Sequence, residues 1–173
     1  MNKIQSPLPD AEKIFAVLEK KLRADMKENV ALVGIRTGGM WVAERLHRNL
    51  ALSLPLGMLD ISFYRDDFDR IGLHADVQPS NIPFEVTGSH IILIDDVVNS
   101  GRTIRAAINE LFDYGRPASI RLATLVDRGE RELPITAQYV GAMLTLPVDK
   151  MLSLQQENDG KFSLKLFDRH GSE

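Results

Sequence analysis

The chain has 173 residues, carries a formal net charge of -3 and contains no cysteine. This length suits one domain with an ordinary core, expected over residues 1–173, and the lack of cysteine excludes disulfides, thiolate zinc sites and cysteine nucleophiles. No stretch is apolar enough for a membrane span or a signal peptide, so we expect a cytoplasmic protein without membrane contacts.

The first half of the chain alternates between helical and strand patterns. Apolar spacing predicts a helix from Pro9-Asp10 through Leu22, a strand over residues 30–35, a helix over 40–50 and a strand through Leu59, Ile61 and Phe63. Residues 66–89 hold prolines and glycines but no sustained period. Loops of this length are usually functional or disordered, so we expect a flexible lid at roughly 66–89.

The second half repeats the alternation. An apolar run leads into Asp95 and Asp96, and the pattern then predicts a helix that stops at Gly115, strands over 119–126 and 138–144, and short strands over 148–167 with a turn at 157–160. Strands that alternate with helices predict an α/β fold with a mainly parallel central sheet flanked by helices.

Three polar segments follow predicted strands: residues 36–39, 95–103 and 127–134. In open parallel sheets, ligands bind outside the carboxyl ends of the strands, where the strand order reverses. We therefore expect these three segments to converge on one rim of the sheet.

The segment 95–103 combines two carboxylates with a loop suited to an anion. Backbone N–H groups around Ser100 and Gly101, at the start of a helix, form a nest for a phosphate monoester. Asp95 and Asp96 repel a phosphate, so they require ribose hydroxyls, Mg2+ or a developing carbocation. This combination indicates a sugar phosphate. A pair that only caps the helix and solvates the strand end is the alternative.

Arg36, Thr37, Gly38 and Gly39 form a second candidate anion site, with one cation, one hydroxyl and permissive backbone at a helix start. A plain tight turn explains the same residues. Two anion sites around an acidic centre predict a substrate with phosphate at one end and pyrophosphate at the other. The chain has no P-loop and no dinucleotide-binding glycine motif.

The run ILIDDVVNSGRT, which ends at Thr103, resembles the phosphoribosyl pyrophosphate signature of type I phosphoribosyltransferases. LDISFYRDD, DYGRP and LVDRGERELPI resemble the PyrR family, whose members are pyrimidine operon regulators and uracil phosphoribosyltransferases. The resemblance implies a type I phosphoribosyltransferase fold with a small hood over the base site. It also implies transfer of phosphoribose to uracil, giving UMP and pyrophosphate.

The resemblance implies a role for each matching residue. Asp95 and Asp96 bind ribose hydroxyls and Mg2+, Arg36 to Gly39 meet pyrophosphate, and Arg128 lies near the base. Arg65 in the lid supplies charge to pyrophosphate on closure, unless it is only an exposed loop arginine. The 5′-phosphate site comprises Val98, Asn99, Ser100, Gly101, Arg102 and Thr103, and Val97 is a further expected substrate-binding residue.

Two functional classes remain open: a uracil phosphoribosyltransferase that also regulates pyrimidine genes, and an RNA-binding regulator that senses UMP with little or no catalysis. The net charge disfavours general nucleic-acid binding, but arginines between Arg102 and Arg131 allow a local basic face for pyrimidine-operon mRNA. A mixed-charge surface is the alternative. Another base is a further option within the enzyme class, and the family implies a homodimer or higher homo-oligomer.

Overall fold

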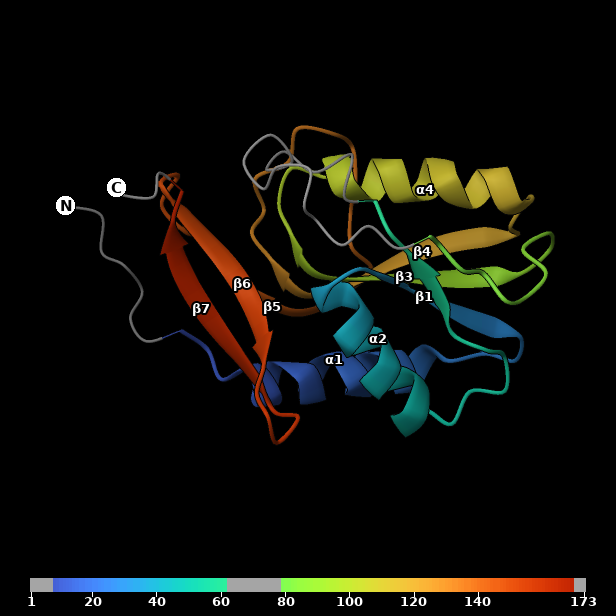
Figure 1. Cartoon of the computed structure of the whole chain (residues 1–173), viewed down its shortest axis with the longest axis horizontal. Coiled ribbons are helices and arrows are strands. Elements are labelled where there is room, and N and C mark those ends of the chain that lie inside the picture. Colours follow the sequence, from blue (N-terminus) through green and yellow to red (C-terminus); the bar gives the residue numbers. More distant parts are fainter. Residues whose placement is uncertain (1–7, 62–78, 170–173) are drawn as a thin grey trace.

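The structure, a computed structural model, describes residues 8–61 and 79–169, and within them a parallel sheet lies between helices on both faces (Figure 1). The sheet of these residues is 5-stranded, in the order β2-β1-β3-β4-β5, and a separate antiparallel hairpin joins β6 to β7. The elements are α1 (Ala11–Asp25), β1 (Val30–Ile35), α2 (Gly38–Asn49), β2 (Gly57–Leu59), β3 (His90–Val98), α4 (Arg102–Tyr114), β4 (Ser119–Asp127), β5 (Tyr139–Met143), β6 (Lys150–Gln156) and β7 (Phe162–Asp168).

The strand order confirms the predicted α/β class and locates the point where the connections reverse. From β1 the chain crosses through α2 to β2 on one side, and β3 then returns to the opposite side of β1. The crossovers after β3 continue away from β1, through α4 to β4 and on to β5. The reversal therefore lies between β1 and β3, which is where a ligand cleft forms in sheets of this kind.

Both faces of the sheet are buried, which explains why its strands read as continuous apolar runs. Figure 1 shows α1 and α2 on one face and α4 on the other. Because side chains alternate along a strand, Leu32 and Ile94 join the core under α1 and α2. Their neighbours Val33 and Leu93 join the core under α4.

The hairpin β6–β7 lies beside one end of the central sheet (Figure 1). Its register pairs Gln156 with Phe162, and Glu157 N donates to Lys161 O at 2.8 Å in the turn. Leu154 and Phe162 are buried in the same core as α1 and α2. The predicted pair of short strands with a polar turn is thus confirmed, and side chains attach it to the domain.

The predicted strand through Leu59 and Ile61 ends earlier in the structure, because β2 ends at Leu59, and Phe63 lies outside the described residues. Residues 66–78 of the predicted lid lie outside the described residues. Residues 79–89, the rest of the predicted lid, pack against the domain. Asn81 forms an antiparallel bridge with Met58, and Val86 is 1% exposed.

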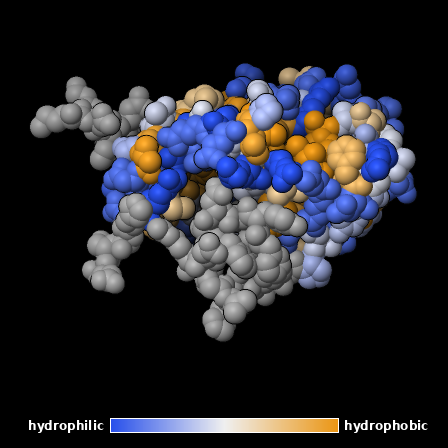
Figure 2. Space-filling view, turned by 90° about the horizontal axis from the view of Figure 1, so that it is seen from above, coloured by the Kyte–Doolittle hydropathy of each residue, from blue (hydrophilic) through white to orange (hydrophobic). Residues whose placement is uncertain are grey.

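Seen from the side of α4, the surface is mainly hydrophilic, with hydrophobic side chains between the polar ones (Figure 2). Phe112 and Tyr114, near the end of α4, are among the exposed large hydrophobic residues. In the part of the chain that the structure describes, no helix has the length and apolar character needed to cross a membrane.

A polar cluster ties α1 to the β5 edge of the sheet. Tyr139 donates its hydroxyl to Asp25 Oδ2, and Arg121 Nη1 donates to Asp25 Oδ2 at 2.8 Å and to the Tyr139 hydroxyl at 2.9 Å. Burial raises the pKa of Tyr139, and the hydrogen bond from Tyr139 lowers the pKa of Asp25. The cluster therefore favours neutral Tyr139 beside charged Asp25.

We predict that Tyr139→Phe lowers the free energy of unfolding at neutral pH, because the Asp25 carboxylate loses the hydrogen bond from the Tyr139 hydroxyl. Asp25 has a lowered pKa in the folded state, so its contribution is present above the ordinary carboxyl pKa and is lost as pH falls through the lowered value. Urea unfolding at several pH values measures this. Tyr114→Phe, at a residue that is 43% exposed, is the control. Equal stability of wild type and Tyr139→Phe at pH 7 would contradict the prediction.

Candidate active site

Asp95 and Asp96 lie within β3, which continues to Val98, so the acids belong to a paired strand rather than to the loop behind it. Asp95 is 3% exposed, and its Oδ1 accepts from Asp96 N at 3.0 Å. From the neighbouring strand, Thr124 Oγ1 donates to Asp96 O at 3.3 Å. The strand therefore fixes the backbone of both acids at the reversal point, and the Asp95 carboxylate is held by its bond to Asp96 N.

The glycine turn, residues 36–39, packs directly on the acid pair. A Cβ atom on Gly38 would lie 2.4 Å from Asp96 Oδ2, and one on Gly39 would lie 2.6 Å from Ile94 O. Only glycine fits these two positions without movement of β3 or its side chains. α2 begins at Gly38, so the first N–H groups of that helix lie beside the carboxylates.

The Ser-Gly loop, residues 99–103, connects β3 to α4. Gly101 precedes the helix with φ +91°, a left-handed conformation that favours glycine. Arg102 N donates to Ser100 Oγ at 3.3 Å. A small cavity of about 90 Å³ is lined by this loop together with Asp95. The loop and the helix start lie where an anion nest is predicted, and phosphate binding there stays a prediction.

Arg131, which follows β4 in the chain, links the Ser-Gly loop to the end of β4 by hydrogen bonds. Its Nη1 donates to Asn99 O at 2.8 Å, and its Nη2 donates to Asp127 Oδ2 at 2.6 Å. Glu132 N donates to Ser100 O at 2.9 Å in the same contact. The sequence placed Arg131 in a recognisable motif, but nothing in that motif indicated which loop the side chain would hold.

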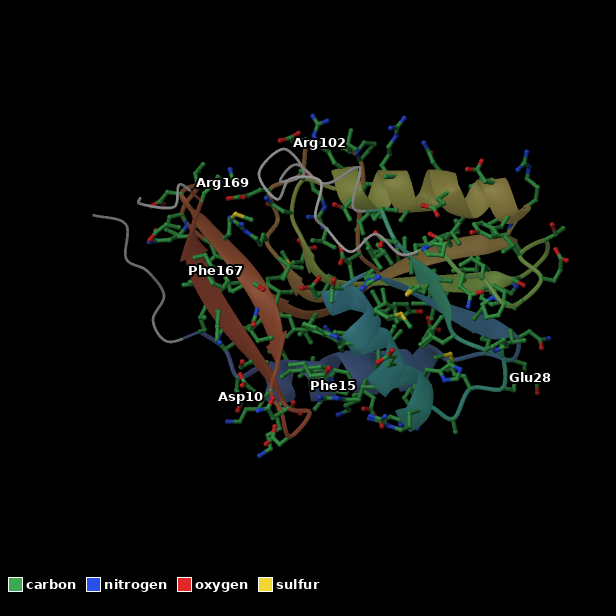
Figure 3. All side chains as sticks on the ribbon, in the orientation of Figure 1. Asp10, Phe15, Glu28, Arg102, Phe167 and Arg169 are labelled. Carbon is green, nitrogen blue, oxygen red and sulfur yellow. The ribbon has the colours of Figure 1, made fainter. Side chains whose placement is uncertain are left out.

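A larger cavity of about 280 Å³ opens between the acids and the hairpin β6–β7. It is lined by Asp95, Asp96, Val97, Asn99, Thr103, Arg128, Met151, Leu152, Ser153 and Arg169. Figure 3 shows Arg169 at the end of the hairpin away from its turn. The cavity therefore has both acidic residues, Asp95 and Asp96, and two arginines, Arg128 and Arg169, in its lining.

Arg128 is buried, with 5% of its surface exposed. Its Nη2 lies 3.3 Å from Glu130 Oε2, and burial lowers the pKa of its guanidinium. Arg128 Nε and Asn99 Oδ1 are buried without a hydrogen-bond partner among the described residues. Buried polar groups are rarely left unpaired, so these two atoms are unusual among the residues that line the cavity.

The predicted convergence is confirmed for the described residues. The segments behind β1, β3 and β4 meet at one rim, with Gly38 and Gly39 against the acids and Arg128 across the cavity. Arg65 lies outside the described residues, so its role stays a prediction. The hairpin residues Met151 to Ser153 and Arg169 were missed, because the pattern of β6 and β7 carries no signal for which face meets a ligand.

The parallel sheet with helices on both faces is the fold of a type I phosphoribosyltransferase, and Asp95 and Asp96 lie at its rim. The family model described as "Phosphoribosyl transferase domain" matches residues 7–146. Among solved structures, a hypoxanthine-guanine phosphoribosyltransferase from Bacillus anthracis has a TM-score of 0.64 at 20% identity and covers 87% of each chain. The hypoxanthine phosphoribosyltransferase of Trypanosoma cruzi has a TM-score of 0.60 at 19% identity over 80% of this chain and 81% of its own.

Curated relatives identify the family more narrowly. "Bifunctional protein PyrR" from Nitrosococcus oceani is 51% identical over 153 residues, covering 87% of this chain and 86% of that protein. The protein of the same name from Pseudomonas aeruginosa is 52% identical over 151 residues, covering 85% of this chain and 89% of that protein. The chain belongs to the PyrR family of phosphoribosyltransferases.

We predict different outcomes when Gly38 and Gly39 are each replaced by alanine. In Gly38→Ala the new Cβ meets the Asp96 carboxylate, which can rotate away. We expect near-normal stability but weaker binding of Mg-phosphoribosyl pyrophosphate, by about tenfold or more. In Gly39→Ala the Cβ meets the backbone oxygen of Ile94, so we expect a loss of about 1–3 kcal/mol in stability.

Thermal unfolding and calorimetric titration of both variants measure the contrast. Each variant is the control for the other, because the chemical change is identical and the positions are adjacent. Wild-type ligand affinity in Gly38→Ala would show that the turn does not press on the acid pair in solution.

Proposed function

We propose that the chain transfers phosphoribose from phosphoribosyl pyrophosphate to uracil, giving UMP and pyrophosphate. The observation that carries the proposal is the acid pair of Asp95 and Asp96 between two backbone anion sites at the reversal point of the sheet. Membership of the PyrR family supports a pyrimidine as the acceptor.

The proposed substrate spans the cavity from one anion site to the other. The 5′-phosphate occupies the Ser-Gly loop, where Ser100 and Thr103 add hydroxyl donors to the helix N–H groups. The ribose hydroxyls meet Asp95 and Asp96, and the pyrophosphate meets the glycine turn. The base then lies at the remaining end, beside Arg128 and Met151 to Ser153. The buried Nε of Arg128 is a donor suited to a carbonyl oxygen of uracil.

The acid pair also fits Mg2+. This ion is usually held by one or two carboxylates together with substrate phosphates, and Asp95 and Asp96 are adjacent carboxylates next to the proposed pyrophosphate site. Bound Mg2+ offsets the negative charge that grows on departing pyrophosphate. Holding the ion is thus a second role that we assign to Asp95 and Asp96.

The geometry supports a reaction through a cation-like ribose. Breaking the anomeric bond leaves positive character on the sugar and negative charge on pyrophosphate. The carboxylates of Asp95 and Asp96 stabilise the sugar, and the N–H groups at the start of α2, with Arg36, stabilise the leaving group. Exclusion of water protects the reactive centre, and we propose that the 66–78 segment, with Arg65, performs it.

A second proposed function is nucleotide-responsive regulation through pyrimidine-operon mRNA. The relatives are named bifunctional, and exposed arginines, Arg102, Arg105 and Arg116, lie on or just behind α4. Arg102 Nε already lies 2.6 Å from Glu132 Oε2, so its charge is partly offset. We further propose a homodimer or higher homo-oligomer. Such an assembly would bring together two faces that carry these arginines, and analytical sedimentation would detect it.

The proposal predicts Mg2+-dependent formation of UMP from uracil and phosphoribosyl pyrophosphate, abolished by EDTA. We expect Asp96→Asn to weaken binding of Mg-phosphoribosyl pyrophosphate by about tenfold or more, because a neutral amide is a poor ligand for a hard cation. Asp113→Asn, on the far half of α4, is the matched control and should behave as wild type.

An RNA gel shift on the leader of the protein's own pyrimidine operon belongs beside this assay. Turnover without a shift identifies an enzyme without the regulatory role. A UMP-dependent shift without turnover identifies a sensor. Unchanged titrations in Asp96→Asn would remove the acid pair from the proposed site.

A further inference from the structure

The hairpin β6–β7 is separate from the central sheet, so other contacts must keep it next to the cavity. In the described residues it makes no backbone pairing with the central sheet. An isolated two-stranded hairpin is at best marginally stable, so side-chain contacts must fix its position. Met151, Leu152 and Ser153 of β6 line the cavity, and their distance from a bound base depends on those contacts.

Arg45 of α2 contacts both α1 and this hairpin. Its Nη1 donates to both carboxylate oxygens of Glu12 at 2.9 Å, and its Nη2 donates to Gly160 O in the hairpin turn. The guanidinium lies 3.4 Å from the ring centroid of Phe162 and 4.9 Å from that of Phe15. One side chain therefore contacts α1 and the hairpin at the same time.

Glu12 and the two rings complete this contact, which we call the Arg45 clamp (Glu12, Phe15, Arg45, Gly160 and Phe162). Glu12 Oε1 also accepts from Phe162 N at 2.6 Å, and the two rings pack edge to face with centroids 5.7 Å apart. The Arg45 side chain is only 15% exposed, so solvent screens its interactions weakly. Figure 3 shows Phe15 on α1 near the turn of the hairpin.

The same helix carries the clamp and the glycine turn. α2 begins at Gly38, against Asp96, and Arg45 follows about two helical turns later, roughly 10 Å along the axis. A rigid helix thus sets the hairpin relative to the acid pair.

We propose that Arg45 is a positioning residue for the base end of the cavity. Through the clamp it holds β6 at the distance at which Met151 to Ser153 enclose the base. This inference rests on the proposed function in assigning a pyrimidine to that end. It separates base recognition, which depends on Arg45, from phosphate and ribose recognition, which depends on β3 and the Ser-Gly loop.

The test compares the affinities of UMP and ribose 5-phosphate, which share phosphate and ribose but differ in the base. In Arg45→Met, which keeps an unbranched apolar stem, we expect the Kd of UMP to rise about tenfold. The Kd of ribose 5-phosphate should stay within about twofold. Arg45→Lys retains the charge but not the planar fork, so its UMP affinity should lie between those of wild type and Arg45→Met.

Arg23→Met is the control, because Arg23 also joins α1 to α2, through Glu19 and Asn49 O, without contacting the hairpin. It should change neither affinity. Equal weakening of both ligands in Arg45→Met, or a lower Tm with unchanged UMP affinity, would show that Arg45 only stabilises the fold and would overturn the inference. If Arg45→Met does not fold, the same comparison in Arg45→Lys decides.

Binding and turnover measurements on the wild-type protein distinguish a failure of the role assigned to Arg45 from a failure of the proposed function. UMP that binds without turnover would refute catalysis alone and leave the role of Arg45 to the variant comparison. Wild-type protein that binds UMP no more tightly than ribose 5-phosphate would refute base recognition in this cavity, and with it the role of Arg45.

Discussion

The packing of the glycine turn on the acid pair is the constraint on which the site depends. Gly38 and Gly39 have no side chains, so the start of α2 lies against Asp96 and the backbone of β3. This contact brings helix N–H groups, which favour anions, next to carboxylates, which favour cations and hydroxyls. A side chain at position 38 would displace the Asp96 carboxylate, and one at position 39 would push against the backbone of β3. The proposed chemistry needs both within the length of one sugar.

The charged residues that line the cavity suit the proposed cleavage of the anomeric bond. In that step positive charge develops on the sugar and negative charge develops on pyrophosphate. Asp95 and Asp96 lie on a paired strand that fixes their backbone, and the buried Arg128 lines the same cavity. Burial lowers the pKa of Arg128, but an arginine stays charged at neutral pH, so the cavity retains a fixed donor there. Because these groups are held before substrate arrives, little reorganisation is needed as charge develops.

Features that arise from local sequence patterns could be predicted from the sequence, whereas contacts between residues far apart in the chain could not. The apolar runs and the polar segments behind them predicted the parallel sheet and its functional rim, because the carboxyl ends of parallel strands share one edge. The Arg45 clamp could not be predicted, since Arg45 and Gly160 are far apart in the chain and neither belongs to a motif. Arg131 shows the intermediate case, in which a motif marked the residue but not the loop it holds.

The separation of the hairpin from the sheet bears on how one fold can serve different bases. The hypoxanthine-guanine phosphoribosyltransferase of Bacillus anthracis shares this fold over 87% of each chain at only 20% identity. Such a comparison shows the fold alone, and folds host many specificities through the sites built on them. In this chain the acid pair and the two proposed anion sites belong to the sheet and its helix starts. Among the described residues, Met151, Leu152 and Ser153 of the hairpin line the same cavity. We therefore propose that changes in the hairpin and its clamp alter which base fits, while the groups proposed to contact ribose and phosphate keep their positions.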